Sequence, residues 1–575
     1  MNEKLKNSIS RRNFIGLAGG AVSVAAIASL GIATDWALNN LEVDLDELEV
    51  EKMTTDVLVI GSGMAGLFAA VKAHDAGAKV LMVSKGRLGA SGQTPFAKGI
   101  FAYDPAKEKL SIDDFVDTVS RSALGTNNPV YTKQMAEHSL ARVNDLKAWG
   151  FFDSTLYHKS FSKPIEERNI PVEERIVITH LIKEEEKIVG AAGFSVDKQK
   201  VIFYEAKSVI LCTGAGGFKP NGFPICDLTH DGTIMAYEIG AKVTGKEWND
   251  GHPGKAENPA ACYDGWGDMF ERKPGTTGVE VHHDLGVDMN YMAYTNGNPL
   301  KMGPPGSEAN DNTSEGPYTP SEFKKGNSKP PKKEGRRPPK EGGAPPGMNG
   351  ARVGGSSAGM AIHKAEGLVP INDQCESNIP GLYAAGDALG SYMAGAIYTQ
   401  IGSSLAGSAV QGGVAGEAAA NFSRNAKERG ISSIKIKEIK EEILAPLKRE
   451  SGYSPAWVTQ TLQGIMIPNF IIYIKKENLL KAALAYVEEL RDHHLPMLRA
   501  ANMHELRLAH ETANMIVSAE MKLKASIMRT ESRCSHFRLD YPAIDNENWE
   551  AWINIFKGED GSMQFEKQPF NNWIV

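Results

Sequence analysis

The chain is poor in cysteine. Its 575 residues include five cysteines, and none of them forms a C-x-x-C pair or a cluster with metal-ligand spacing. This spacing argues against an iron–sulfur centre or a c-type haem within the chain. We expect buried thiols rather than a disulfide framework at these positions, which are Cys212, Cys226, Cys262, Cys375 and Cys534.

The sequence also lacks an excess of positive charge and, beyond its N-terminal segment, long apolar runs. Lysine and arginine number 63 against 70 acidic residues, and the net charge of −7 argues against a generally basic nucleic-acid binder. The apolar run 465–474 is too short for a membrane span of ~20 residues and contains Pro468. The length and ordinary composition predict a globular protein with more than one domain.

The first 50 residues have the layout of a targeting segment. Two lysines precede the stretch Ser10-Arg11-Arg12-Asn13-Phe14-Ile15, and an apolar run of small residues covers 16–33. This order is typical of a twin-arginine signal with possible cleavage after Ala33, and the alternative is an N-terminal membrane anchor with chance arginines. The sequence therefore predicts export to the periplasm or the outer face of the cytoplasmic membrane. An acidic connector follows at 42–51.

A glycine-rich turn lies inside a complete strand–turn–helix–strand pattern. The apolar run 55–60 ends in Gly61-Ser62-Gly63-Met64-Ala65-Gly66, helical spacing follows, and a second apolar run covers 79–83. The first glycine permits the turn, the second lets a pyrophosphate approach the backbone, and the third lets helix and strand pack closely. The phosphates would lie at the helix N-terminus, where free N–H groups favour anions. The whole stretch predicts a dinucleotide site.

Two later stretches indicate which dinucleotide binds. Ser84-Lys85 stands where an NAD site usually has an acidic residue for the ribose, which weakens a plain NAD reading. The run 208–217 enters a glycine turn at Thr213-Gly214, and the run 379–388 ends in a Gly-Asp turn at Asp387, whose carboxylate could bond a ribityl chain. Each run alone could be an ordinary buried strand entering a turn. Together with the first motif they favour FAD.

The remaining stretches predict elements around this fold. A loop over 91–99, with Gln93 and Thr94, is expected beneath the flavin ring, and a small-residue helix over 401–417 is expected to pack against the cofactor.

After about residue 430 the chain is expected to be helical, and one long helix carries the apolar stripe Leu506, Ala509, Ala513, Ile516, Leu523 and Ile527. Other predicted elements are helices within 111–150 and 229–241, strands at 175–182, 188–194 and 200–204, and a charged tail at 529–542 that seals a domain interface or faces a second protein chain.

The middle of the chain changes in character. Residues 303–347 are rich in proline, glycine and lysine and predict an extended insertion, whose basic charges suit solvent or a partner. The dinucleotide fold is expected to resume at 353–357. Trp248 and Trp266 predict either an aromatic substrate pocket or a packed core. The pair His282-His283 has no third ligand at a useful spacing, so we expect no metal site.

These motifs resemble one family. The stretches at 61–66, 84–85, 229–232, 252–253, 380–387, 531–533 and 540–542 are similar to the flavoproteins of fumarate reductase, succinate dehydrogenase, L-aspartate oxidase and the adenylylsulfate reductase α subunit. The resemblance covers about 55–255 and 350–550, and 545–552 looks closest to adenylylsulfate reductase. It implies an α/β fold with a Rossmann-like FAD-binding domain, an inserted capping domain and a helical C-terminal domain. The expected boundaries are 1–50 for signal and connector, 51–245 and 351–428 for the FAD domain, 246–350 for the cap, and 429–575 for the helical domain.

The resemblance also implies site residues, with three departures. FAD contacts are expected from Gly61, Gly63, Met64, Ala65, Gly66, Ser84, Lys85, Gln93, Thr94, Thr213, Gly214, Asp231, Asp387, Ser403, Ser404 and Leu405. The family's covalent-flavin histidine falls at Gln93, which cannot form that bond, so FAD should be non-covalent. A second family histidine falls near Gly350, and the arginine that grips a substrate carboxylate falls at Gln400. Loss of a bidentate arginine makes fumarate or succinate a poor substrate.

Candidates for proton transfer are His252, Arg352 and Arg272. His252 matches the family's substrate-side His-Pro, and the alternative is a structural histidine bonded to backbone. Arg352 precedes a Gly-Gly turn and alternatively anchors an anion, whereas Arg272 alternatively lies on the surface. The leading hypothesis is an exported FAD-dependent reductase of a small activated organic substrate, supplied by a membrane or periplasmic cytochrome or iron–sulfur carrier. The alternatives are a dehydrogenase that passes electrons to an iron–sulfur partner and a flavoprotein that only relays electrons.

Overall fold

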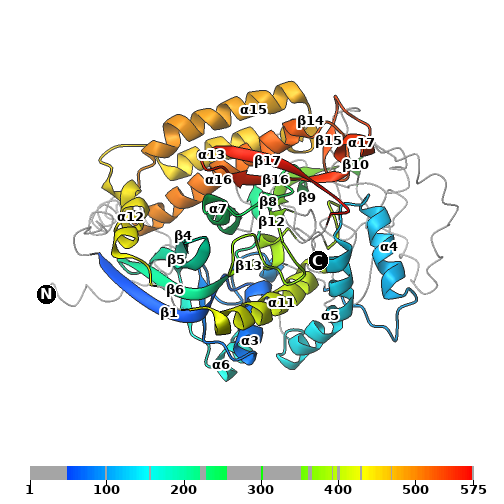
Figure 1. Cartoon of the computed structure of the whole chain (residues 1–575). Helices are drawn as coiled ribbons and strands as arrows, with labels where there is room; N and C mark the ends of the chain where they lie inside the picture. Colours follow the sequence, from blue (N-terminus) through cyan, green and yellow to red (C-terminus); the bar gives the residue numbers. More distant parts are fainter. Residues whose placement is uncertain are drawn as a thin grey trace, which may run out of the picture.

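The computed structural model describes residues 48–96, 100–153, 157–219, 228–255, 300–301, 351–359, 366–390, 393–397, 402–427, 430–467 and 469–572. The predicted N-terminal signal and the predicted proline-rich insertion at 303–347 lie outside these ranges. No helix in the described part of the chain combines the length and the hydropathy that a membrane span needs. Figure 1 shows the arrangement of the described elements.

A mixed sheet forms the centre of the molecule. Its order is β3-β2-β1-β6-β5-β4, with β13 paired to β6. The last four residues of β1, Val57 to Ile60, are apolar and buried, as expected of a parallel strand covered on both faces. The strands are β1 (Glu49–Ile60), β2 (Val80–Ser84), β3 (Val172–Glu174), β4 (Ile176–Glu184), β5 (Lys187–Ser195), β6 (Lys200–Leu211) and β13 (Leu382–Ala384). Residues 200–204 and 208–211, predicted as separate strands, therefore form one.

Strand β13 returns the chain to this sheet after a long excursion. It pairs in parallel with β6, Leu382 opposite Val209. Segments on both sides of the predicted cap therefore build one sheet, and their carboxyl ends meet at one edge. Figure 1 shows α3 (Met64–Asp75) and α11 (Ser403–Asn425) on one side of the sheet and the C-terminal helices on the other.

A second sheet is built around β11 (Ala351–Gly359). This strand pairs antiparallel with β7 (Gly216–Phe218), β9 (Asp250–Lys255) and β10 (Leu300–Lys301). Residues 353–357, where the dinucleotide fold is predicted to resume, therefore pair with β9 of the predicted cap and, at Ser357, with β7 of the predicted FAD domain. The hydrophobic pattern of a strand does not identify its partner, since pairing is decided by the position of distant segments.

Helix α11 packs against α3 through its small residues. A side chain at Gly412 would lie 2.2 Å from the Ala65 carbonyl oxygen, and one at Gly416 would lie 2.4 Å from the Ala69 carbonyl oxygen. These two glycines permit close contact between two helices, whereas the predicted packing of this helix against the cofactor involves Ser408, which lines the cleft described below. Composition could not distinguish the two cases, because both need a surface without side chains.

The C-terminal region is helical as far as Met528, as predicted. The apolar stripe lies on α16 (Met503–Met528), and most of it contacts a core formed with α13 (Pro455–Met466) and α15 (Glu477–Glu489). The chain then forms a hairpin of β16 (Ala551–Lys557) and β17 (Met563–Pro569), which joins β8 (Val243–Thr244) and β12 (Gly367–Leu368). The helical prediction is wrong for this hairpin. Other helices are α4 (Ile112–Ser122), α5 (Pro129–Ala148), α6 (Tyr157–Glu167), α7 (Asp231–Glu238), α12 (Ser433–Leu444), α14 (Asn469–Ile472) and α17 (Asn546–Trp549).

Candidate cofactor site

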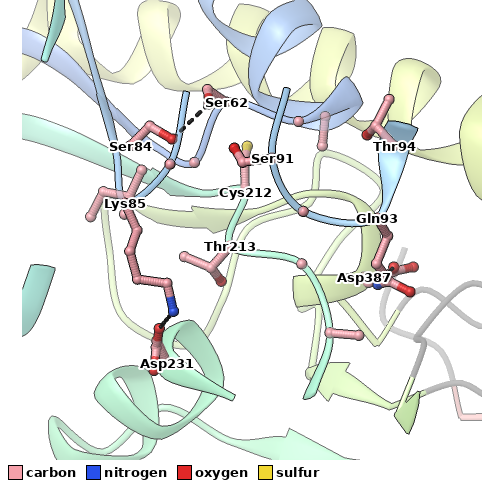
Figure 2. A pocket seen from close by; sticks show the side chains of 18 of the residues that line it. Ser62, Ser84, Lys85, Ser91, Gln93, Thr94, Cys212, Thr213, Asp231 and Asp387 are labelled. Atoms are coloured by element: carbon pink, nitrogen blue, oxygen red, sulfur yellow. Dashed lines mark hydrogen bonds and ion pairs between the residues drawn. The ribbon is translucent and has the colours of Figure 1, made fainter. Parts of the chain in front are cut away.

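A cleft opens where the strands of the central sheet end. It contains about 950 Å³ of space, a volume that includes open solvent at its mouth. Figure 2 shows its polar side chains converging from four separate parts of the sequence. Predicted residues that line it are Gly61, Gly63, Met64, Ala65, Ser84, Lys85, Gln93, Thr94, Thr213, Gly214, Asp231 and Asp387.

The glycine-rich turn has the geometry that the motif predicts. Gly61 has φ of +111°, which favours glycine, and α3 begins directly after Gly63. A side chain at Gly66 would lie 1.9 Å from the Gly61 carbonyl oxygen, so the third glycine does permit close packing of helix and strand. The Met64 amide is held by Thr94 Oγ1 at 3.2 Å. The turn thus offers backbone at the start of a helix, where an anion binds well.

Replacement of Gly66 by alanine should weaken FAD binding on the order of 100-fold, because overpacking by one methyl costs up to ~3 kcal/mol. Here the clash is with backbone, so α3 must move away from the turn. Quenching of flavin fluorescence during titration of the apoprotein would measure the affinity.

The matched control is Gly464→Ala in α13, where an added methyl would meet no atom of the described chain within 4 Å. This control should bind FAD normally and gain about 1 kcal/mol of stability from helix propensity. Equal FAD affinity in both variants would show that the close packing at Gly66 is unnecessary for binding.

The end of β2 carries a pair of serines instead of an acid. Ser62 Oγ and Ser84 Oγ lie 2.6 Å apart and are buried. Lys85, the next residue, extends to Asp231, where its Nζ lies 2.8 Å from Oδ2 (Figure 2). Burial alone would raise the pKa of Asp231, but the charge of Lys85 and hydrogen bonds from Lys85, Asn514 and Thr229 hold that pKa below its usual value. A carboxylate therefore does stand beside the end of β2, supplied by α7.

The opposite part of the cleft joins the loop over 91–94 to the turn after β13. Gln93 Nε2 donates to Asp387 Oδ2 at 3.0 Å. Thr213 Oγ1, on the wall between the two regions, is buried and meets no hydrogen-bond partner within the described ranges. A buried hydroxyl without a partner usually marks a place for a ligand or water. The donor set and the glycine turn therefore fit a dinucleotide.

The structure separates some predicted residues from the cleft and adds others. Gly66 packs behind the turn, and Ser403, Ser404 and Leu405 form the first turn of α11 outside the cleft lining. The lining residue of α11 is Ser408. Sequence reasoning also missed Ile176, Ile178, Cys212, Leu228 and Met235. The period-2 spacing of the first two in β4 was the available signal, because such residues share one face of a strand.

Two of the three candidates for proton transfer lie on neighbouring strands of the second sheet. In the register of β9 and β11, His252 is opposite Ser356 and Lys255 is opposite Arg352. The offset of three residues along β9 corresponds to roughly 10 Å. β11 also pairs with β7, which begins directly after Ala215 of the cleft wall. Arg272, Gly350, Gln400, Trp266 and His282-His283 lie outside the described residues.

Next to the cleft, His230 forms part of a buried polar cluster. Its Nδ1 lies 3.0 Å from Ser518 Oγ and 3.6 Å from Glu366 Oε1, and Lys246 Nζ lies 2.7 Å from the same carboxylate oxygen. Burial is the main reason why the pKa of His230 falls from 6.5 to about 4, and Lys246 lowers it further. The imidazole is therefore neutral in the folded protein at neutral pH.

Stability should consequently fall as the pH drops from about 6.5 toward 4. The unfolded state takes up a proton at its ordinary pKa, whereas the folded state does so only near 4, so His230 should account for about 2 kcal/mol of lost stability between pH 7 and 5. His230→Asn should reduce the difference in stability between pH 7 and pH 5 by this amount, because asparagine does not titrate. Asparagine also tolerates the φ of +61° at this position. Urea unfolding at the two pH values measures it, and an unchanged difference would contradict the assignment.

The charged tail predicted at an interface is buried. Arg529, Glu531, Arg533 and Arg538 are at most 2% exposed. Arg529 binds Glu247 and Glu531, and its guanidinium lies 5.0 Å from the ring centre of Trp248. The tail therefore seals the C-terminal region against the segment that leads into β9. Trp248 belongs to this packed core and not to an aromatic substrate pocket.

Buried free thiols are found at Cys212, Cys375 and Cys534, as expected, whereas Cys226 and Cys262 lie outside the described ranges. Burial raises the pKa of Cys375 to about 12. The thiols of Cys212 and Cys375, whose pKa is raised by burial, are therefore protonated at neutral pH and behave as small packing groups.

Comparison with known proteins agrees with this geometry. Residues 56–159 match the model of an FAD binding domain, and residues 459–573 match that of the fumarate reductase flavoprotein C-terminus. The chain is 24% identical over 563 residues to a chain of the CoM/CoB fumarate reductase of Methanothermobacter marburgensis, covering 88% of this chain and 98% of the relative. It is 24% identical over 587 residues to the fumarate reductase flavoprotein of Haemophilus influenzae, covering 90% and 95%.

Solved structures share the fold. Adenylylsulfate reductase of Archaeoglobus fulgidus superimposes with a TM-score of 0.70 at 18% identity, covering 93% of this chain and 98% of the other. The quinol fumarate reductase FrdA of E. coli gives 0.67 at 17% identity, covering 91% and 97%. The glycine turn, the cleft and these matches define an FAD-dependent oxidoreductase. The matches confirm the predicted resemblance to the flavoproteins of fumarate reductase and succinate dehydrogenase, together with the predicted fold class and the cofactor FAD.

Proposed function

We propose that the protein reduces an activated C=C bond, or a similar group, of a small organic substrate, with hydride transfer supplied at N5 of bound FAD. The observation that carries this proposal is the cleft, whose lining combines the glycine turn with two carboxylates, in a chain aligned along most of its length with fumarate reductases. Gln400 stands where the family has an arginine that binds a substrate carboxylate. The loss of this arginine argues for a substrate other than fumarate or succinate.

We propose distinct roles for the residues of the cleft. The turn over 61–66 holds the pyrophosphate, Lys85 and Asp231 receive the adenosine half, and Gln93 with Asp387 receives the ribityl and flavin half. His252, on the adjacent cap strand, delivers a proton from its imidazole to the substrate carbon next to the one that is reduced. Arg352 on the neighbouring strand holds a negatively charged group of the substrate.

The flavin should be released by acid. Gln93 has no nucleophilic atom that forms the family's histidyl bond, and its amide is instead hydrogen-bonded to Asp387. Trichloroacetic acid precipitation should therefore leave essentially all of the yellow colour in the supernatant. Colour that remains with the pellet would show a covalent link at another residue.

We further propose that the protein is exported by the twin-arginine pathway and receives electrons from a cytochrome or an iron–sulfur protein. The Arg-Arg signal layout supports export, and the fact that both fumarate reductase relatives are single subunits of their enzymes supports a partner. Fusion of residues 1–50 to a reporter that folds before export would test the first point. Loss of periplasmic reporter after Arg11→Lys and Arg12→Lys is expected, and unchanged export would contradict it.

An anaerobic reaction panel tests the function. The dithionite-reduced protein is mixed with enoates and other candidate oxidants, and flavin absorbance is followed. Rapid reoxidation by one compound, faster than by the remaining panel, is expected. Bleaching of the oxidised flavin by a reduced compound would instead indicate a dehydrogenase, and indifference to every compound would indicate an electron relay; either result would overturn the proposal.

A further inference from the structure

Helix α16 carries a polar stripe in addition to its apolar one. Glu511, Asn514, Ser518 and Lys522 follow one another at intervals of three and four residues, so they share one face of the helix. Each contacts the first half of the chain. Their partners are Lys85, Asp231, His230 and the Lys246 carbonyl oxygen, respectively. The stripe thus runs from the cofactor cleft to the segment that leads into the cap.

The first two residues of the stripe fix the polar pair in the cleft. Lys85 Nζ lies 2.8 Å from Asp231 Oδ2 and 2.8 Å from Glu511 Oε1. Asn514 Nδ2 donates to Asp231 Oδ1 at 2.9 Å. Both oxygens of Asp231 are therefore bound, one by Lys85 from the end of β2 and the other by the C-terminal helix. Arg507, 3.7 Å from Glu511, balances its charge.

The position of this pair in the fold identifies the part of the cofactor that it meets. In a dinucleotide fold the end of the second strand faces the adenosine ribose, and an acid there usually accepts from the ribose hydroxyls. Ser84 carries no carboxylate, and Asp231 supplies one beside the same strand end. We propose that Asn514 and Glu511 of the C-terminal domain are positioning residues for the adenosine half of FAD, because they hold Asp231 and Lys85 in their binding geometry before FAD arrives.

The expected gain comes from preorganisation. Ordering a long polar side chain during binding weakens affinity, and a side chain that is already held avoids this loss. Because two side chains are held here, removal of the support should weaken FAD binding by about tenfold. The inference rests on the proposed placement of FAD in the cleft and is independent of the substrate and the direction of catalysis.

Asn514→Leu is the sharpest variant, because it removes the hydrogen bond without a change of charge and nearly without a change of volume. FAD affinity of the apoprotein should fall about tenfold, and ADP, which carries only the adenosine half, should lose affinity by the same factor in calorimetric titration. Asn514→Gln keeps the amide donor and should restore most of the affinity. Glu520→Gln is the matched control: it lies on the same helix and pairs with Arg491 and Lys524 away from the cleft. It should leave both affinities unchanged.

A second measurement does not depend on any variant. Addition of FAD to the wild-type apoprotein should slow amide hydrogen exchange across residues 508–518 more than across α15, which supplies none of the residues that line the cleft. Normal FAD and ADP affinity in a folded Asn514→Leu protein, or equal exchange of α16 with and without FAD, would overturn the inference. Failure of the wild-type protein itself to bind FAD would instead refute the cofactor placement.

Discussion

Substitution of Arg529 by methionine should destabilise the protein by about 3–5 kcal/mol, the usual cost of removing one partner from a buried ion pair. Its side chain is completely buried. Nε lies 2.8 Å from Glu247 Oε1, and Nη1 lies 2.8 Å from Glu531 Oε1. The guanidinium also lies about equally far from two indole rings, 5.0 Å from that of Trp248 and 5.1 Å from that of Trp549. Methionine would fill the space but leave two carboxylates in the interior with less compensation.

The size of the effect distinguishes this cluster from surface pairs. Arg175→Met removes an exposed pair with Asp197, whose side chains are 37% and 58% exposed, and should cost less than about 1 kcal/mol. Arg529→Lys keeps the charge but cannot reach both carboxylates in a planar fork, so an intermediate loss is expected. Urea unfolding of the three variants measures these values. A loss below about 1 kcal/mol in Arg529→Met would show that water or rearrangement compensates the buried acids.

Substitution of His252 by alanine should lower turnover by about 10²- to 10⁴-fold while the protein remains yellow, because general acid catalysis contributes on that scale. β9 carries His252 and is held against β11, which also pairs with β7 at the cleft wall. The candidate proton donor and the cofactor cleft are thus connected through one strand. His493→Ala, which changes a histidine whose side chain is 67% exposed, is the control and should retain full turnover.

The pH dependence separates His252 from Arg352. A histidine donor loses its proton in the neutral pH range, so the rate of substrate reduction should fall as the pH rises through that range. An arginine remains charged throughout and would give no such decline. Arg352→Met should therefore raise KM and preserve the pH profile. Unchanged turnover in His252→Ala would contradict proton transfer by His252. Loss of the decline in rate at high pH only in Arg352→Met would contradict it as well.

The local sequence pattern was sufficient to predict much of the fold. The β-branched run before Gly61 and the apolar stripe of α16 bury their side chains as predicted, because period and composition reflect burial directly. The hairpin at 551–569 was missed because its outer strand alternates weakly and is half exposed, so it lacks the apolar pattern of a core strand. The pairing of the strand at 351–359 with β7, β9 and β10 was not predicted, because a strand's partner is not encoded within the strand.

Some residues of the candidate site could likewise be predicted from the sequence, and others could not. Gly61, Gly63 and Thr213 could be predicted, because a tight turn at the end of a buried strand has a distinct sequence. Ser408 of α11 and Ile178 of β4 were missed, since they line the cleft only through the way in which their elements pack. The buried tail from Arg529 to Arg538 was predicted only as an interface, and its ion pairs with Glu247 depend on contacts between distant segments.

By itself the sequence determined that this protein carries the glycine turn of a dinucleotide fold, that its cofactor is FAD, and that an apolar helix lies near its end. The tertiary structure alone decided which groups surround the nucleotide. Lys85 and Glu511 are 426 positions apart and yet 2.8 Å from each other. The reason is physical. The secondary structure of a segment follows from its own side chains, whereas an ion pair between distant segments forms only where hydrophobic burial has packed those segments together.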